Sequence, residues 1–207
     1  MKLEMKMNKP ITIDPEITLK RLEIDDAQEL FDLTEENQTY LRRWVAWIDS
    51  TNTVDNRREF IQGTIDQFEK GLGPTYAIIV NNSIAGVIGF HPIDQSNHVG
   101  EIGYWLSEEH QGKGIMTNCC KALIKQAFES LNINRLQIPA AEDNIKSRSI
   151  PERLGFTFEG ILRECENLYG NFVNQAMYSM LESEYEKRFS NQRVNPTWTT
   201  PVDSVRV

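Results

Sequence analysis

Two glycines between a strand pattern and a helix pattern make one part of this sequence suited to binding an anion. Residues 101–106 alternate apolar and other side chains, which predicts a half-buried strand. Between residues 116 and 131 apolar side chains recur every three or four positions, which predicts a helix with one buried face. Gly112 and Gly114 therefore lie where that helix begins. Because the first N–H groups of a helix lack partners within it and the helix dipole is positive there, the segment predicts an anion site.

A plain tight turn is the alternative role of these glycines, and the glycines alone leave it open. Two familiar phosphate loops are absent: the sequence lacks Gly-x-x-x-x-Gly-Lys-Ser/Thr, and no third glycine stands at the dinucleotide-fold spacing. The anion must therefore be identified from other residues.

Asn144 and Ser147 are a second pair suited to chemistry, because they lie three residues apart at the start of another helix pattern and so share one face. Pro151 has no N–H to bond the carbonyl of Ser147, which leaves that turn open. Helix capping is the ordinary role of asparagine and serine at such a position, and it remains the alternative here.

Together the two segments resemble the GNAT family of acetyl-CoA-dependent N-acetyltransferases, and within it the branch that acetylates the N-termini of ribosomal proteins. The pyrophosphate loop of that family reads Gln/Arg-x-x-Gly-x-Gly/Ala. Gln111 and Gly114 match this pattern, whereas Met116 departs from the small final residue. Further similarity to the branch lies in residues 41–44, 101–106 and 155–160, so the resemblance covers residues 15–185.

The resemblance implies an α+β fold: a twisted, mostly antiparallel sheet flanked by helices, with one parallel pair of strands that splays apart. The pantetheine arm of acetyl-CoA enters between these two strands, and the glycine loop binds the pyrophosphate. The cofactor-binding residues expected on this basis are Tyr104, Trp105, Leu106, Gln111, Gly112, Lys113, Gly114, Ile115, Met116, Asn144 and Ser147. Three nearby basic residues either contact the CoA phosphates or form a solvated helix face: Lys146, Arg148 and Arg153.

Catalytic roles are also implied by the resemblance. Ser147 has the position of a serine thought to protonate the CoA thiolate, and Glu166 has that of the proposed general base of the branch. Glu101 has the position that many other members use, so both carboxylates are candidates, directly or through one water. A solvated carboxylate is the alternative for each. Holding amine and thioester together supplies most of the acceleration, and no acyl-enzyme is required.

The acceptor is the least defined part of the site. Tyr40, Trp44 and Trp47 either belong to the core or wall an acceptor pocket. An α-amine with a pKa near ~8 is about one-tenth neutral at pH 7, whereas a lysine amine is neutral only about once in a few thousand. A modest base therefore suits a protein N-terminus, which the branch suggests is that of a ribosomal protein. The alternatives are a small amine, such as a polyamine or aminoglycoside, and a non-catalytic acetyl-CoA sensor.

The composition indicates one ordinary globular domain. The chain has 207 residues, of which 40% are hydrophobic and 25% charged, and its net charge of −8 disfavours nucleic-acid binding and suits a cationic acceptor. The charged N-terminal segment lacks a signal-peptide pattern, and no long apolar run predicts a membrane span, so we expect a cytoplasmic protein. We expect a domain over residues 1–190 and a loose tail over 191–207, in which Trp198 is an anchor candidate. Members of the branch are often dimers, so a homodimer is a further expectation.

Cysteine and histidine residues suggest no other chemistry. The three cysteines are odd in number and lack metal-ligand spacing, so we expect reduced thiols: Cys119, Cys120 and Cys165. The first two fall on the apolar face of the helix and are expected in the core. The three histidines show no metal-ligand spacing either, and no metal is expected: His91, His98 and His110.

The remaining patterns predict the elements that position these residues. We expect Asn81 and Asn82 to form a hairpin turn, and Pro139 to end its strand early because it cannot donate a hydrogen bond. The predicted helices are 25–34, 40–48, 56–70 and the one after Gly114. The predicted strands are 17–22, 76–80, 83–91, 99–106, 135–138, 157–163 and 172–181, with a loop through Gly170 before the last.

Overall fold

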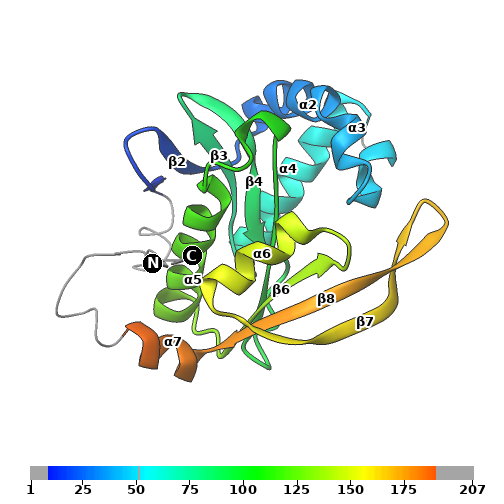
Figure 1. Cartoon of the computed structure of the whole chain (residues 1–207). Helices are drawn as coiled ribbons and strands as arrows, with labels where there is room; N and C mark the ends of the chain where they lie inside the picture. The colour runs from blue at the N-terminus through cyan, green and yellow to red at the C-terminus, as the bar shows by residue number, and fades with distance from the viewer. Residues whose placement is uncertain (1–8, 51, 190–207) are drawn as a thin grey trace, which may run out of the picture.

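A single sheet of eight strands forms the centre of the protein in the computed structural model, which describes residues 9–50 and 52–189 (Figure 1). The strand order is β1-β2-β3-β4-β5-β6-β8-β7. The predicted tail 191–207, with Trp198, lies outside the described residues. The strands are β1 (Ile11–Thr12), β2 (Ile17–Arg21), β3 (Thr75–Val80), β4 (Ser83–Phe90), β5 (Val99–Leu106), β6 (Arg135–Ala141), β7 (Thr157–Leu168) and β8 (Asn171–Leu181).

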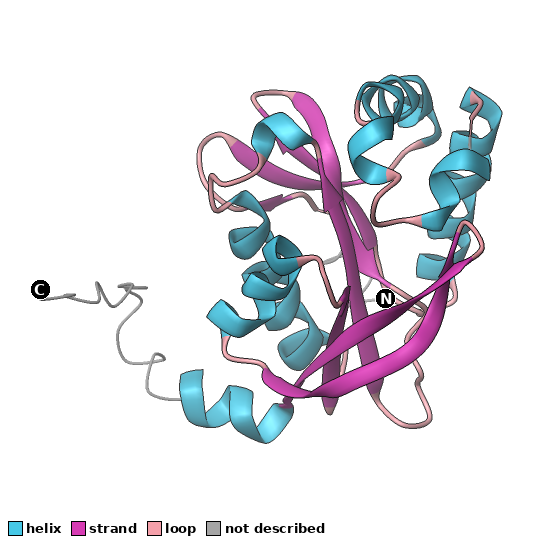
Figure 2. Cartoon of the chain, turned by 45° about the vertical axis from the view of Figure 1, so that its right-hand side comes forward, coloured by secondary structure: helices cyan, strands magenta, loops and turns pink. Residues whose placement is uncertain are grey.

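Helices cover both faces of this sheet (Figure 2). On β3 and β4, Ile78 and Ile88 pack into one hydrophobic cluster, whereas their neighbours Ala77 and Val87 pack into the other, as strand alternation requires. The larger cluster lies under α5 (Ile115–Ser130) and α6 (Ile145–Leu154), and the smaller lies under α2 (Ala27–Glu36) and α4 (Val54–Glu69). The chain also contains the helices α3 (Gln38–Leu41) and α7 (Glu182–Phe189) and the 3₁₀ turns η1 (Ile24–Asp26), η2 (Ala46–Ser50) and η3 (Glu108–His110).

The predicted splay between two parallel strands is confirmed. β5 and β6 pair in parallel only between residues 99–101 and 135–137, whereas β4 continues to pair with β5 as far as Leu106. Within residues 9–50 and 52–189, the edge of β5 that faces β6 therefore has no strand partner from Ile102 to Leu106. The backbone groups of a strand are obligatory hydrogen-bonding groups, so this edge is ready to pair with an extended ligand.

The predicted helix over 40–48 is wrong. α3 ends at Leu41, and the chain turns before η2 begins at Ala46. Aromatic and β-branched side chains in this stretch are weak helix formers, and the Arg42 guanidinium donates to the Asp49 carboxylate at 2.9 Å, which folds the segment back on itself. The segment 38–50 is thus a compact turn-rich element.

Two predicted strand ends are also wrong. β6 runs past Pro139 to Ala141, because a strand with one unpaired edge tolerates a residue without an N–H. β7 runs to Leu168 instead of ending at residue 163, with a bulge at which the register shifts between Leu162 and Glu166. Glu164 adopts a φ of +49° in this bulge, and its N–H donates to the side chain of Asn174 at 2.8 Å. Glu166 therefore lies in a strand and not in a loop.

Candidate active site

The glycine loop before α5 forms a cradle of free backbone N–H groups. Gly112 and Gly114 have φ values of +72° and +77°, in the left-handed region that favours glycine. Gly114 is the N-cap of α5, and no side chain in the described part of the chain caps that helix end. The N–H groups of its first turn have no intrahelical acceptor, so they are free donors at the positive end of the dipole.

Asn37, which lies 71 positions before Glu108 in the sequence, holds the start of this loop in place. It lies between α2 and α3, is 9% exposed, and donates to the carbonyl of Leu33 at 2.8 Å. Its side-chain oxygen accepts from the N–H of Glu108, also at 2.8 Å. A single buried amide therefore joins the end of α2, directly before the 38–50 segment, to the loop that carries the glycines.

A cavity of about 700 Å³ extends from the cradle along the open end of β5 to the start of α6. It contains every predicted cofactor-binding residue except Lys113, and it brings together segments that are far apart in the sequence. The predicted residues that line it are Tyr104, Trp105, Leu106, Gln111, Gly112, Gly114, Ile115, Met116, Asn144 and Ser147.

Several polar residues of the cavity were missed in the sequence. Thr117, Asn118 and Lys121 line it from the first turns of α5, at spacings that place them on adjoining faces of the helix. That spacing, read outward from Gly114, is the signal that would have identified them.

The three basic residues near α6 divide into two groups. Lys146 and Arg153 line the cavity, where Lys146 donates to Gln111 at 3.2 Å and Arg153 donates to Thr117 at 2.8 Å. Arg148 instead donates to the Tyr178 hydroxyl at 3.0 Å and to a backbone carbonyl of β6's outgoing loop, which gives it a structural role. Two cations are therefore available to a bound anion, and the third is not.

Ser147 and Tyr104 place two hydroxyl groups side by side in this cavity. The Ser147 hydroxyl donates to the Tyr104 oxygen at 3.3 Å, and the Tyr104 hydroxyl lies 3.3 Å from the Ser147 carbonyl, the group that Pro151 leaves without a helical donor. Asn144 accepts from the Ser147 N–H at 3.1 Å, so it does cap α6. Burial raises the pKa of Tyr104, which keeps its hydroxyl protonated at neutral pH.

The three aromatic residues of the predicted acceptor wall do not share one environment. Tyr40 and Trp44 line the cavity, whereas Trp47 does not. Trp47 packs on Trp105 with ring centroids 6.3 Å apart, and the buried Arg57 guanidinium lies 5.0 Å from its ring centroid. Trp47 is half-buried and packs behind the lining residue Trp105, so it belongs neither to the cavity lining nor to the buried core.

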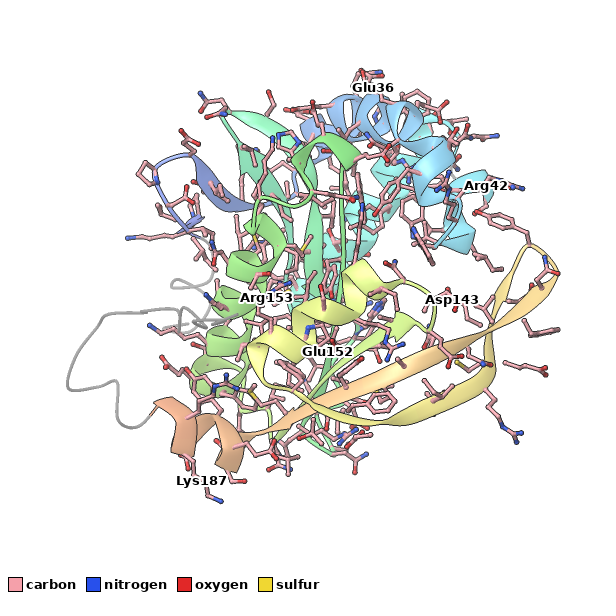
Figure 3. All side chains as sticks on the ribbon, viewed as in Figure 1. Glu36, Arg42, Asp143, Glu152, Arg153 and Lys187 are labelled. Atoms are coloured by element: carbon pink, nitrogen blue, oxygen red, sulfur yellow. The ribbon has the colours of Figure 1, made fainter. Side chains whose placement is uncertain are left out.

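A second cavity of about 400 Å³ adjoins the first and shares Trp44 with it. Arg43 and Trp44 form one wall, and the β7–β8 hairpin forms the other with Leu168 and Phe172. Three carboxylates line it against the single cation of Arg43, namely those of Glu142, Asp143 and Glu164. Figure 3 shows Asp143 in the loop between β6 and α6.

The two candidate bases lie outside the residues that line either cavity, in different surroundings. Glu166 is half-buried, pairs across the hairpin with Val173, and accepts from Gln175 at 2.8 Å. Directly paired residues point to one face, so Glu166 shares a face with Val173, which lines the second cavity. Glu101 lies in the part of β5 that pairs with β6, with its carboxylate 3.7 Å from a nitrogen of His91.

Burial makes two of the three cysteines poor nucleophiles. Cys119 and Cys120 are buried in the core as predicted, and desolvation raises the pKa of Cys119 to about 12 and that of Cys120 well above its usual value. Cys165 is exposed on β7. His110 lines the first cavity, and its Nδ1 lies 2.7 Å from the Ser107 hydroxyl.

Residues 9–50 and 52–189 contain neither a metal-binding cluster nor a helix that could cross a membrane. No group of His, Cys, Asp and Glu side chains in these ranges is arranged to hold a metal ion. In the same ranges, no helix has the length and apolar character needed to cross a membrane.

Similarity to known proteins agrees with this geometry. A family model described as an acetyltransferase (GNAT) domain matches residues 16–157. The chain is 38% identical to the putative ribosomal N-acetyltransferase YdaF of Bacillus subtilis, over 84% of this chain and 96% of the relative. It is 29% identical to the ribosomal-protein-serine acetyltransferase of Escherichia coli, over 84% of this chain and 98% of the relative.

Solved structures give the same result. The ribosomal L7/L12 acetyltransferase RimL in complex with coenzyme A has a TM-score of 0.81 at 28% identity, and the match covers 85% of this chain and 99% of RimL. The microcin C7 self-immunity acetyltransferase MccE, in complex with acetyl-CoA and AMP, has a TM-score of 0.79 at 34% identity, covering 83% and 95%. The present chain therefore belongs to the GNAT family and is an N-acetyltransferase.

Proposed function

We propose that this protein transfers the acetyl group of acetyl-CoA to the N-terminal α-amine of a ribosomal protein in the cytoplasm. One observation carries the proposal: the open end of β5, the glycine cradle and Ser147 meet in one cavity. The acceptor class is supported by the similarity to the ribosomal-protein-serine acetyltransferase of Escherichia coli. The domain expected over residues 1–190 would act as one catalytic unit.

The residues of the first cavity fit acetyl-CoA. The cradle offers N–H donors to the pyrophosphate, and Lys146 and Arg153 offer charge to phosphate groups. The unpaired edge of β5 offers its backbone to the pantetheine amides. Acetyl-CoA, when bound, supplies the thioester carbonyl that the amine attacks.

Protons are moved by side chains at either end of the reacting bonds. The bond between the amine nitrogen and the acetyl carbon forms as the carbon–sulfur bond breaks. Ser147 donates its hydroxyl proton to the departing sulfur and is reprotonated through solvent by the proton that the base takes from the amine, while the neutral Tyr104 hydroxyl holds its position. Glu166 accepts the proton of the amine, through one water. An N–H of β5 near Leu106 polarises the carbonyl.

The second cavity supports an α-amine as the acceptor. Its carboxylates, including Glu142 and Asp143, attract an ammonium group, and the net charge of −8 favours its approach. At the site a modest base is sufficient, because an α-amine with a pKa near ~8 is already partly neutral at pH 7.

A small amine is the second candidate acceptor. The 34% identity to MccE favours it, because MccE is a self-immunity acetyltransferase for microcin C7 and its complex contains AMP, a small molecule. Carboxylates in the second cavity would also attract a polyamine.

The decisive experiment is an acetyl-transfer assay with the full chain. N-terminal peptides of ribosomal proteins, the same peptides with a formylated N-terminus, and small amines are each incubated with acetyl-CoA, and free thiol and product mass are measured. We expect acetylation of the free peptides and no acetylation of the formylated ones. Turnover of small amines alone would contradict the ribosomal acceptor, and acetyl-CoA binding without thiol release would indicate a sensor.

A further inference from the structure

The tip of the β7–β8 hairpin is fastened to the 38–50 segment by one residue. Tyr169 and Gly170 form the turn, with φ values of +55° and +87°. The Tyr169 hydroxyl donates to the carbonyl of Val45 at 2.7 Å, across 124 positions in the sequence. Figure 1 shows this hairpin extending away from the sheet toward α3, so the contact at its tip crosses from one arm of the molecule to another.

A cation strengthens the same contact. The Arg42 guanidinium lies 4.2 Å from the centre of the Tyr169 ring and donates through two nitrogens to Asp49 at 2.9–3.1 Å. Figure 3 shows Arg42 on the side of α3 that faces the hairpin tip. The tyrosine therefore holds the segment through its hydroxyl and through its ring.

Tyr169 joins the two parts of the chain that form the walls of the second cavity, which we call the acceptor side. Val45 lines the first cavity, and Trp44 lines both cavities. On the hairpin, Leu168 precedes Tyr169 and lines the second cavity. The distance between the two walls of the second cavity is thus set where Tyr169 meets Val45.

We propose that Tyr169 is a positioning residue for the acceptor, which keeps the walls of the second cavity at a fixed spacing. This inference rests on the proposed function, in which the acceptor reaches the thioester through that cavity. Its hydrogen bond and ring contact reach Val45 and Arg42, beside the shared Trp44, and not the glycine cradle, so its loss should weaken acceptor binding and leave acetyl-CoA binding unchanged.

The test removes first the hydroxyl and then the aromatic ring of Tyr169. Tyr169→Phe removes the hydrogen bond to Val45 and keeps the ring beside Arg42, whereas Tyr169→Leu removes both. We expect the KM for the acceptor to rise about 2- to 10-fold in Tyr169→Phe, as for one lost hydrogen bond, and further in Tyr169→Leu. The Kd for acetyl-CoA, measured by calorimetry, should stay within about twofold of the wild type.

The matched control is Tyr185→Phe. That hydroxyl donates to Glu129 at 2.9 Å at the far end of the molecule, so its removal tests a tyrosine hydroxyl remote from both cavities. We expect no change in the KM for the acceptor. An equal rise in the control and in Tyr169→Phe, or a parallel rise in the Kd for acetyl-CoA, would overturn the positioning role.

Hydrogen exchange tests the contact between Tyr169 and Val45 in the absence of an acceptor. In Tyr169→Phe we expect faster amide exchange both in residues 42–50 and in residues 164–173, because the contact holds both. Unchanged exchange in residues 42–50 would overturn the proposal. If the wild type acetylates small amines but no peptide, the proposed acceptor fails, and the same exchange and KM measurements with the amine decide on Tyr169.

Discussion

The cofactor side and the acceptor side of this enzyme are held in place by different means. On the cofactor side the geometry is set by backbone: two left-handed glycines, a helix start and a strand edge left open by the splay. On the acceptor side it is set by side-chain contacts between exposed elements, such as Arg42 with Asp49, whose side chains are 53% and 40% exposed. Under the proposed function, cofactor binding is therefore set by the path of the backbone, whereas the choice of acceptor would depend on a few side chains.

The largest effect is expected where the two sides meet, at Ser147. Ser147→Ala should lower kcat about 100-fold, at the lower end of general-acid contributions, because the departing sulfur loses its proton donor. The Kd for acetyl-CoA should change little. Steady-state kinetics and calorimetry measure the two quantities.

Tyr104→Phe separates the two hydroxyls of this pair. If Tyr104 only holds Ser147, its removal should cost much less than the loss of Ser147, and the double variant should resemble Ser147→Ala. A larger loss in Tyr104→Phe would assign the proton donor to the tyrosine.

Gly114→Val tests the backbone character of the cofactor side. A Cβ there meets no heavy atom of the described residues within 4 Å, but the φ of +77° strains any L-residue and should displace the cradle. We expect the Kd for acetyl-CoA to rise at least about 10-fold, as measured by calorimetry.

Gly170→Val is the matched control, since Gly170 has a φ of +87° and a Cβ there is equally free of the described atoms. It should lose similar stability without losing acetyl-CoA affinity. If the Kd for acetyl-CoA rose equally in both variants, general backbone strain, and not the glycine cradle, would explain the loss of binding.

Glu166→Gln tests the acceptor side. We expect kcat to fall about 10-fold at pH 7 and the deficit to shrink above pH ~8, where an α-amine deprotonates unaided. Glu101→Gln is the comparison variant, on the paired part of β5. A loss in Glu101→Gln alone would move the base to β5.

Glu159 should have the smallest effect, because it lies away from both sides. Hydrogen bonds from Arg135 and then Ser179 lower the pKa of Glu159 to about 2, so its stabilisation is present above the unfolded pKa near 4.5 and is lost as the pH falls through about 2. Glu159→Gln should cost less than about 1 kcal/mol of unfolding free energy at pH 7, since the pair is partly exposed. Urea unfolding should show this difference vanishing toward pH 2, and at pH 7 the variant should keep the wild-type activity.

Local patterns were sufficient for the elements whose shape depends on near neighbours. The turn at Asn81 and Asn82, both with positive φ, and the α5 helix after Gly114 follow from residue types within a few positions. The splay of β5 from β6 was available only through the family resemblance, because spacing alone does not reveal where a strand pair ends.

Elements that depend on distant partners could not be predicted. The 40–48 stretch carries a helical apolar pattern, but the chain turns after Leu41, and Tyr169, 124 positions away, holds it at Val45. The extension of β7 to Leu168 depends on its pairing with β8, and Pro139 is tolerated because of an unpaired neighbouring edge. The second cavity combines three such regions, so no single sequence pattern contains it.

Asn37 has a consequence for engineering. Because its amide is buried and bonds to both the α2 end and the N–H of Glu108, it marks a boundary at which the acceptor wall begins and the cofactor loop is anchored. A foreign 38–50 segment joined after Asn37 would keep that anchor and bring its own aromatic wall. With Tyr169 retained to meet the backbone of residue 45, we expect acceptor preference to be exchangeable by grafting one short loop.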